Sequence, residues 1–244
     1  MSVQEATGWE DIARWYDVLV TGESGPHSTA LECTRRLCGD LTGLRVLDLA
    51  CGQGLATRAL VALGAAELVG VDSSPTLVSI AREREEAQHL GIRYALDDAQ
   101  ALQTIEDSAF DLVNCQLGLM DIPDLIATLV SVARVLRARG AFVFVIGHPA
   151  FLAPNATRVT DADGRQGVQV HEYLAEAFWR SANPEGVRRV GNYHRPISTY
   201  LNGLIAHGFA LEVLDEPRGS DLLVKHSPVY ERVPIFLGVR ARLA

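Results

Sequence analysis

The segment from Val46 to Gly54 carries the clearest chemistry in the sequence: an apolar run that contains Asp48, followed by Gly52 and Gly54. Glycine has no Cβ and accepts positive φ, so the backbone at both glycines can approach a ligand closely. The helix expected after Gly54 would add free N–H groups and a positive dipole end. A carboxylate at Asp48 would sit poorly beside a pyrophosphate. The segment therefore predicts a site for a ligand that carries positive charge.

Alternating strands and helices are predicted around this segment. The expected strands are the apolar runs Leu44–Leu49, Leu68–Asp72, Ile92–Leu96, Phe110–Gln116 and Ala141–Ile146. The expected helices are two within Ile12–Leu41, broken near residues 22–26, then Thr57–Leu63, Ser73–His89, Asp124–Leu136 and Thr199–His207. The first of these strands is almost entirely apolar, and such strands alternating with helices are typical of a buried parallel sheet with right-handed crossovers.

The end of the chain departs from this alternation. Two further strands are expected at Phe209–Asp215 and Val233–Ala241, and the connection between them, 216–232, shows no helical pattern. They should therefore pair antiparallel at the edge of the sheet. The whole pattern predicts one α/β domain, residues 1–244: a three-layer, doubly wound sheet of seven strands, mostly parallel with an antiparallel terminal strand.

Two segments lie outside the sheet pattern. Residues 1–41 are expected to form an N-terminal helical cover, and residues 149–196, rich in Pro and Gly, an irregular, lid-like insert. The insert contains several aromatic side chains and a histidine, which favour either an acceptor pocket wall or simple packing of the lid: His171, Tyr173, Phe178, Trp179 and Tyr193.

Composition narrows the classes of partner. The net charge of −8 and the lack of a basic stripe argue against nucleic acid as a partner. No apolar run reaches the ~18 residues of a membrane helix, and the first residues lack the features of a signal peptide. The 4 cysteines show no metal-type spacing, so we expect free thiols, no metal site and a cytoplasmic protein with a small-molecule partner.

With its glycine-rich segment and the strands around it, the chain resembles the class I S-adenosylmethionine-dependent methyltransferases that act on small molecules. Residues 47–54 are similar to the glycine-rich first motif of the family, and Phe110–Leu117 to its fourth-strand motif. Residues 134–142 resemble a further family stretch, except that Arg139 replaces the usual first glycine of a turn. The resemblance covers residues 9–244 and implies a sheet of seven strands with the last one antiparallel. It also implies S-adenosylmethionine as the cofactor.

The resemblance implies roles for individual residues. Asp72 matches the acid that holds the ribose, because one carboxylate accepts both hydroxyl protons of a vicinal diol. Asp98 and Ala99 match the adenine position, where the carboxylate accepts from the amino group and the Ala99 N–H donates to the ring. Structural alternatives stay open for each: a helix cap for Asp72, a solvated turn for Asp98, and a buried structural acid for Asp48. The further cofactor-binding candidates are Ala50, Gly52, Gly54, Ser73 and Gln116.

The N-terminal segment resembles a part that covers the cofactor in many such enzymes. Tyr16 would hydrogen-bond the methionine carboxylate of the cofactor, while a helix that simply packs on the sheet explains the pattern equally well. Two histidines are candidate general bases, since histidine titrates near neutral pH: His148, just after the fifth strand, and His194, before the last helix. Either could instead anchor a loop.

The leading hypothesis is methyl transfer from S-adenosylmethionine to an oxygen or nitrogen of a small-molecule metabolite. The alternative is a protein that binds S-adenosylmethionine without turnover, as a regulator or partner subunit. An NAD-dependent oxidoreductase is disfavoured, because the third glycine of its fingerprint is missing after Gly54. The sequence indicates neither the acceptor nor the oligomeric state.

Overall fold

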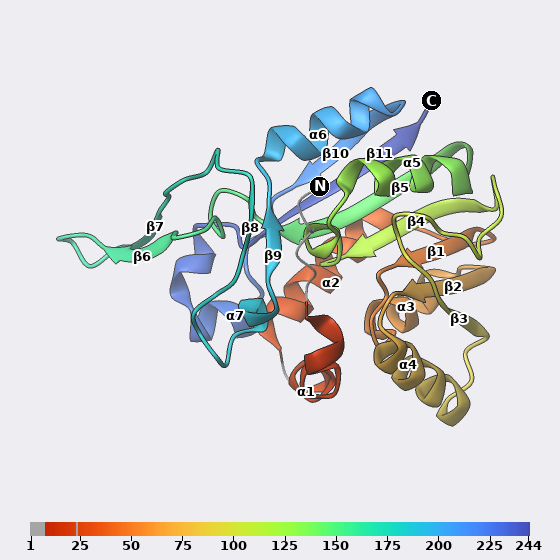
Figure 1. The fold of residues 1–244 in the computed structure, drawn as a ribbon. Helices are drawn as coiled ribbons and strands as arrows, with labels where there is room; N and C mark the ends of the chain where they lie inside the picture. The colour runs from red at the N-terminus through yellow and green to blue at the C-terminus, as the bar shows by residue number, and fades with distance from the viewer. Residues whose placement is uncertain (1–7, 23) are drawn as a thin grey trace.

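A seven-stranded sheet forms the centre of the protein, with the strand order β10-β11-β5-β4-β1-β2-β3 (Figure 1). The computed structural model describes residues 8–22 and 24–244. Residues 1–7 and 23, which belong to the predicted cover, lie outside the described residues. The strands of the sheet are β1 (Arg45–Leu49), β2 (Glu67–Asp72), β3 (Ile92–Leu96), β4 (Phe110–Gln116), β5 (Leu136–Gly147), β10 (Phe209–Asp215) and β11 (Phe236–Leu243).

The direction of the strands confirms the predicted fold. The pairs β1–β2, β1–β4, β2–β3 and β4–β5 are parallel. The terminal strand β11 runs antiparallel to both neighbours, β5 and β10, as expected from the sequence. The carboxyl ends of β1, β2 and β4 therefore meet at one edge, where ligands bind in open sheets of this kind.

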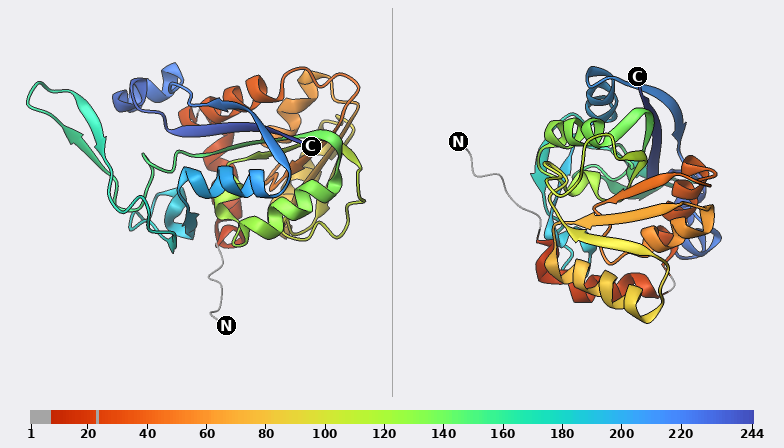
Figure 2. Two further views of the ribbon diagram at one scale, coloured as in Figure 1. Left: turned by 90° about the horizontal axis from the view of Figure 1, so that it is seen from above. Right: turned by 90° about the vertical axis from the view of Figure 1, so that its right-hand side faces the viewer.

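Helices cover both faces of the sheet, because its central strands are apolar on both sides. Successive residues alternate between the two cores: Leu47 packs with α5 and α6 residues, while Val46 packs with α2, α3 and α4 residues. Figure 2 shows these two helical layers on either side of the sheet. The helices are α1 (Trp9–Thr21), α2 (Gly25–Cys38), α3 (Leu55–Leu60), α4 (Pro75–Ala87), α5 (Leu125–Val135) and α6 (Ile197–Ala206).

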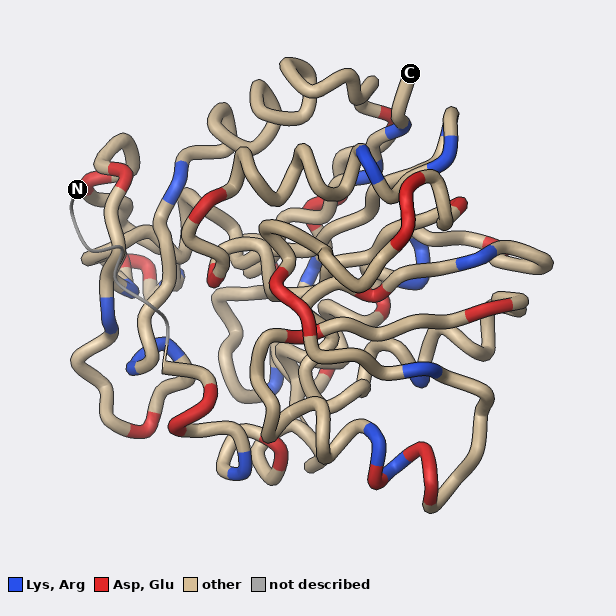
Figure 3. Tube along the Cα trace, turned by 45° about the vertical axis from the view of Figure 1, so that its right-hand side comes forward, with Lys and Arg blue, Asp and Glu red and all other residues tan. Residues whose placement is uncertain are grey.

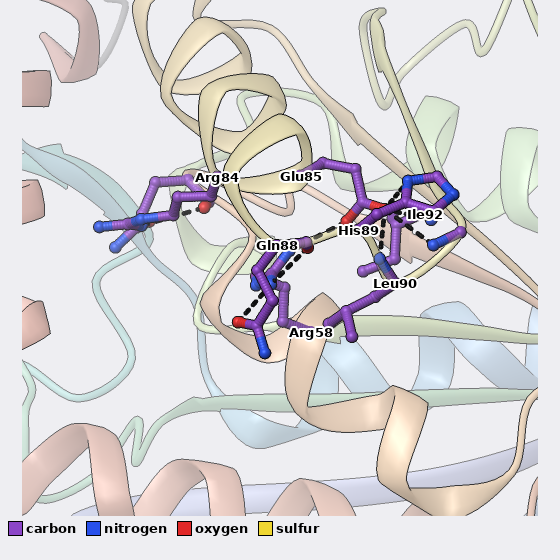
Figure 4. Close-up of polar contacts among 9 residues, drawn as sticks. Arg58, Arg84, Glu85, Gln88, His89, Leu90 and Ile92 are labelled. Carbon is purple, nitrogen blue, oxygen red and sulfur yellow. Dashed lines mark hydrogen bonds and ion pairs between the residues drawn. The ribbon is translucent and has the colours of Figure 1, made fainter.

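Helix α4 is fixed at both ends by side chains. At its start the Ser74 hydroxyl accepts a hydrogen bond from the Leu77 N–H, at 3.2 Å. Near its end the Glu85 carboxylate accepts from the backbone of Leu90 and Ile92 and pairs with Arg58 at 2.9 Å (Figure 4). These contacts attach the helix to the strand that follows it, β3. Strand β2, helix α4 and strand β3 therefore form one connected unit next to the edge of the sheet.

The expectation of an irregular insert at 149–196 was wrong. This segment contains two antiparallel ribbons and one 3-10 helix: β6 (Thr157–Thr160) with β7 (Gln166–Gln169), β8 (Ala177–Trp179) with β9 (Asn192–His194), and η3 (Val187–Val190). The β6–β7 ribbon projects from the rest of the molecule (Figure 2). All residues of β6 are exposed, and β8 and β9 are 3 residues long. Strands this short and exposed lack the apolar alternation that would have indicated them.

The expectation of no helix between the last two strands was also wrong. Residues 216–232 contain α7 (Asp221–His226) and the 3-10 helix η4 (Pro228–Glu231). The 6 residues of α7 are too few to show a helical period in the sequence. A capping contact from the Leu223 N–H to the Ser220 hydroxyl marks its start.

Smaller differences concern the ends of helices. The helix expected at 57–63 is split into α3 and the 3-10 helix η1 (Val61–Leu63), and α4 ends at Ala87 rather than His89. The four cysteines are free and buried, as expected. Among the described residues, no helix combines the length and apolarity needed to cross a membrane.

Candidate functional site

A cavity of about 270 Å³, here named the sheet-edge cavity, opens at the carboxyl ends of β1, β2 and β4. It is bordered by α1 and by the loops that follow the three strands. Its lining residues are Trp9, Glu10, Tyr16, His27, Asp48, Ala50, Cys51, Gly52, Gln53, Leu55, Ala56, Asp72, Ser73, Ser74, Leu77, Gln116, Leu117, Gly118, Asp121 and Ile122.

The glycine-rich segment forms one wall of this cavity in a conformation that its residues make possible. Gly52 and Gly54 have φ of 55° and 82°, and Ala50 shares this left-handed region at 52°. A Cβ at Gly54 would lie 2.4 Å from the Tyr94 hydroxyl, whereas a Cβ at Gly52 would meet open space. Only glycine fits at position 54, and at Gly52 the bare backbone borders free volume.

Asp72 lies at the end of β2, where the sequence placed it, and borders the sheet-edge cavity. Its carboxylate accepts hydrogen bonds from the Gly52 N–H at 2.8 Å and the Ser74 N–H at 2.9 Å. Burial raises the pKa of this carboxyl above its ordinary value. The Ser73 N–H adds a third hydrogen bond, and since a carboxylate offers about four acceptor positions, Asp72 keeps acceptor capacity for a ligand hydroxyl.

Asp48 lies deeper, with 1% of its surface exposed. The Thr57 hydroxyl donates to it at 2.5 Å and the Asn114 amide at 2.6 Å. Burial raises its pKa to about 6, so the group is mostly ionised at neutral pH. Asp48 thus places a negative charge below the first glycine while two polar side chains hold it in position.

The sheet-edge cavity is lined by acids. Four carboxylates border it, from Glu10, Asp48, Asp72 and Asp121, and its walls contain no lysine or arginine in the part of the chain that the structure describes. Burial lowers the pKa of His27 to about 4, so this side chain is neutral at pH 7. Such a cavity suits a cationic ligand and is unfavourable for a pyrophosphate. Away from it, basic and acidic positions are interspersed along the chain (Figure 3).

Tyr16 lies at the sheet-edge cavity on the α1 side. Its hydroxyl is 2.9 Å from His27 Nε2, and its ring packs edge-on against Trp9, with centroids 4.9 Å apart. Burial raises the pKa of the phenol, which therefore stays protonated. The other ring nitrogen of His27, Nδ1, is 2.9 Å from the Ser24 hydroxyl, so both nitrogens are occupied and the Tyr16 hydroxyl is the group available to a ligand below α1.

Helix α1 is attached to α4 by side chains that the sequence did not indicate. The Glu10 carboxylate accepts from the Ser74 and Thr76 hydroxyls at the start of α4. Further along, Asp17 pairs with Arg84 at 2.6 Å. These two contacts hold α1 over the cavity and add an acid to its wall.

The remaining cofactor candidates differ in position. Gln116 borders the sheet-edge cavity, with its Oε1 accepting from the Thr34 hydroxyl at 2.9 Å. Ser73 borders it as well. Asp98 is exposed and its carboxylate accepts hydrogen bonds from Gln100, while Ala99 is buried in the apolar core. Neither Asp98 nor Ala99 is among the described residues that line the cavity, so their adenine role stays a prediction.

A second cavity of about 180 Å³, here named the insert cavity, lies between the insert and the body of the protein. The insert and the loops near β5, β9 and α6 contribute its walls. Its lining residues are Met120, Gly147, Pro149, Phe151, Leu152, Ala153, Ala156, Trp179, Arg188, Asn192, Tyr193, His194, Arg195 and Tyr200. Most of these residues belong to the insert 149–196. Of the side chains singled out there from the sequence, Trp179 and Tyr193 line the cavity, whereas His171, Tyr173 and Phe178 are not among its lining residues.

One ion pair joins the walls of the two cavities. Asp121 borders the sheet-edge cavity, Arg188 borders the insert cavity, and the two side chains are 2.7 Å apart. Burial raises the pKa of Asp121 to about 6, and Trp9 donates a further hydrogen bond to it. The sequence did not indicate either partner, because they lie 67 residues apart and outside any recognisable motif.

The two candidate histidines lie in different environments. The Ala150 N–H donates to His148 Nδ1, so the proton lies on Nε2, which donates to Glu216 at 2.8 Å. Both nitrogens of His148 are therefore occupied, and it does not line either cavity. His194 borders the insert cavity, and its Nε2–H donates to the Tyr173 carbonyl at 2.8 Å. This bond leaves the lone pair on His194 Nδ1, so the geometry favours His194 over His148 as a base.

Comparison with known proteins relates this arrangement to a family. A family model described as a methyltransferase domain matches residues 46–140. A ubiquinone biosynthesis O-methyltransferase of Xanthomonas oryzae pv. oryzae is 34% identical over 101 residues, 41% of this chain and 42% of that protein. A protein of the same name in Coxiella burnetii is 35% identical over 104 residues, 43% of this chain and 44% of the relative. The matched region thus spans less than half the length of these curated relatives.

A solved structure is similar over a larger part of the chain. The crystal structure of an S-adenosylmethionine-dependent methyltransferase from Mesorhizobium loti is 30% identical, with a TM-score of 0.76. The alignment covers 90% of this chain and 100% of that one. The similarity therefore extends well beyond residues 46–140.

Proposed function

This chain belongs to the S-adenosylmethionine-dependent methyltransferases, and on that premise we propose that it transfers a methyl group from S-adenosylmethionine to an oxygen atom of a small molecule. The name shared by the curated relatives, ubiquinone biosynthesis O-methyltransferase, supports oxygen as the accepting atom. The observation that carries the proposal is the acid-lined sheet-edge cavity, joined by the Asp121–Arg188 pair to a second cavity that holds a histidine.

The residues of the sheet-edge cavity fit the cofactor. S-adenosylmethionine is a cation at its sulfur and, when bound, supplies an electrophilic methyl group. The carboxylates of Asp48, Asp72 and Asp121 match that positive charge and the amino group of the cofactor, and they border open volume beside Gly52. Asp72 would hold the ribose hydroxyls, and the Tyr16 hydroxyl and Gln116 would hold the methionine part. Asp98 and Ala99 are proposed for the adenine, on the resemblance alone.

The insert cavity would hold the methyl acceptor, and His194 would accept its proton. An oxygen nucleophile reacts faster once its proton is removed, and a positioned base contributes typically about 10²–10⁴-fold. The Tyr173 carbonyl fixes the His194 tautomer with the lone pair on Nδ1. The rest of the acceleration would come from alignment and exclusion of water under α1, which Glu10 and Asp17 attach to α4.

We also propose a single catalytic domain, with residues 1–41 as an N-terminal helical cover and 149–196 as a lid over the acceptor, in a cytoplasmic protein with a small-molecule substrate. The buried free thiols support that location. The net charge of −8 and the interspersed basic and acidic positions along the trace argue against nucleic acid as a partner (Figure 3). A protein that binds the cofactor without turnover has the same sheet-edge cavity, so turnover must distinguish the two hypotheses.

Calorimetry with S-adenosylmethionine and with NAD tests the proposal directly. We expect micromolar binding of S-adenosylmethionine and none of NAD, because the cavity walls are acidic. Transfer of labelled methyl to a panel of small phenols and amines should then give O-methyl products. No binding of S-adenosylmethionine would refute the proposed function, and binding without transfer to any compound would favour the non-catalytic alternative.

A further inference from the structure

The insert cavity contains side-chain atoms that lack a protein partner. Within the described part of the chain, five buried side-chain nitrogen or oxygen atoms make no hydrogen bond. Three of them belong to residues that line this one cavity: Trp179 Nε1, Asn192 Oδ1 and Arg195 Nη1. Buried polar groups are almost always paired, and an unpaired one costs about 1–3 kcal/mol. Three such atoms around one cavity indicate a ligand that completes their hydrogen bonds.

The β8–β9 ribbon explains how two of these residues come together. Trp179 and Asn192 are directly paired across the ribbon, and His194 lies two residues beyond Asn192. Directly paired residues and residues two apart in a strand share one face. The indole, the amide and the histidine therefore form one polar edge of the insert cavity, with Asn192 and His194 buried to 9% and 5% exposure.

Arg195 adds a positive charge to this edge. Its Nη2 donates to the carbonyls of Ile122 and Pro123, at 2.9 and 2.6 Å, which fixes the guanidinium in place. The side chain is 7% exposed and makes no ion pair with any carboxylate of the described chain. Its guanidinium also lies over the Tyr193 ring, 5.1 Å from the centroid, and donates a hydrogen bond to the Tyr200 hydroxyl. A buried cation without a counterion favours an anionic ligand.

The size and walls of the insert cavity limit the ligand further. An apolar cavity of about 150 Å³ holds benzene, so about 180 Å³ has room for one ring with small substituents. Phe151, Trp179, Tyr193 and Tyr200 supply aromatic surface around it.

We propose that the methyl acceptor is a ring-sized hydroxy compound that carries a carboxylate, bound in the insert cavity by Arg195 Nη1 and Trp179 Nε1. The Asn192 amide oxygen accepts from a hydroxyl of the ring, and His194 faces the hydroxyl that is methylated. This substrate class rests on the proposed function, which itself requires only that some acceptor is methylated.

Binding of three matched probes tests the substrate class: 4-hydroxybenzoate, its methyl ester and phenol, each titrated by calorimetry into the complex with S-adenosylhomocysteine. We expect 4-hydroxybenzoate to bind at least about tenfold more tightly than the ester or phenol, since a hydrogen bond to a charged group is worth about 1.5–3 kcal/mol. Equal affinities, tighter binding of the ester, or no binding of any probe would overturn the substrate class.

Variants assign the effect to the named atoms. Trp179→Phe keeps a ring and removes the donor, so the affinity for 4-hydroxybenzoate should fall about tenfold while that for the ester is unchanged. Trp15→Phe is the matched control, because Trp15 lines neither cavity and stacks on Arg189. Arg195→Gln removes the positive charge, so it should also remove the preference for the acid. A preference that survives in both Trp179→Phe and Arg195→Gln would overturn the assignment.

The outcomes separate this inference from the proposed function. Binding of S-adenosylmethionine with methylation of phenol or the ester, but not of the acid, would leave the methyltransferase standing and refute the substrate class. Absence of S-adenosylmethionine binding would refute the function, whatever the probes do.

Discussion

The walls of the sheet-edge cavity and the insert cavity are joined by the Asp121–Arg188 ion pair, yet the polar side chains of the two cavities differ in how completely the protein satisfies them. In the sheet-edge cavity, Asp48 is held by Thr57 and Asn114, and Asp72 by the backbone of the neighbouring loops. In the insert cavity, three buried polar atoms have no partner in the described chain. The first cavity thus keeps its shape without a ligand, whereas the second obtains its full set of hydrogen bonds only when a ligand is present.

This difference implies a division of labour between the two regions. A constant cofactor is best served by a preorganised wall, since no reorganisation is needed when it binds. An enzyme selects its acceptor through the difference in affinity between competing compounds. A compound that leaves the buried polar groups of the cavity without hydrogen bonds binds more weakly than one that completes them. Variants on each side of the ion pair should therefore change different measured quantities.

The largest expected effect is on the insert side. His194→Gln removes the proposed base, so kcat should fall about 10²–10⁴-fold, while the affinity for S-adenosylmethionine stays unchanged because His194 does not line the sheet-edge cavity. Steady-state kinetics and calorimetry measure the two quantities. His148→Gln is the control, and it should lower the melting temperature rather than kcat, because His148 bonds Glu216 and Ala150. A larger loss of kcat in the control would reverse the assignment.

The next effect is on the sheet-edge side. Asp72→Ala removes the proposed acceptor of two ribose hydroxyls, and the affinity for S-adenosylmethionine should fall about 100-fold or more. Asp98→Ala should cost less, because Asp98 is exposed and lies outside the described lining of the cavity. Calorimetry compares the two variants, with thermal melts to confirm folding. An equal or larger loss for Asp98→Ala would mean that bound cofactor extends to the Asp98 loop.

The smallest effect is a dependence of cofactor affinity on pH, which arises in the sheet-edge cavity. Asp48 and Asp121 both have a pKa of about 6 in the folded protein, against an ordinary value of 3.8, because of burial. Acidification from about pH 7.5 to about pH 5 protonates them, so the affinity for the cationic cofactor should fall about tenfold. The two carboxyls do not titrate independently, because Asp72 interacts with both Asp48 and Asp121. Asp121 also faces Arg188 and Trp9. The measured titration therefore belongs to these interacting side chains together.

The stability of the cofactor-free protein should respond with the opposite sign. A pKa raised in the folded state means that the folded protein takes up protons that the unfolded chain does not. The stability contributed by these two carboxyls is complete below about pH 4 and is lost as the pH rises through about 6. Denaturant titrations at several pH values measure it, with Asp48→Asn as the comparison. If the stability of Asp48→Asn changed with pH as strongly as that of the parent protein, groups other than Asp48 would cause the dependence.

The sequence predicted the sheet and the cofactor half of the site because both rest on local patterns. Strand β1 is buried at Val46, Leu47, Asp48 and Leu49, and the carboxylate of Asp72 follows a buried run at a recognisable distance from Gly54. The insert escaped prediction for a physical reason: β6 is exposed and β8 and β9 are 3 residues long, so no burial period marks them. The pair Asp121–Arg188 connects segments 67 residues apart, and only the folded chain brings them together.

We expect that ion pair to link the two binding equilibria. A ligand that drew Asp121 or Arg188 toward its own cavity would alter the wall of the other, so affinity on one side would depend on occupancy of the other. Thermodynamic reciprocity then requires that the cofactor changes acceptor affinity by the same factor as the acceptor changes cofactor affinity. Loss of the positive sulfur charge after transfer would change the electrostatic balance around Asp121, and the product complex would thereby differ from the substrate complex at a contact between the two cavities.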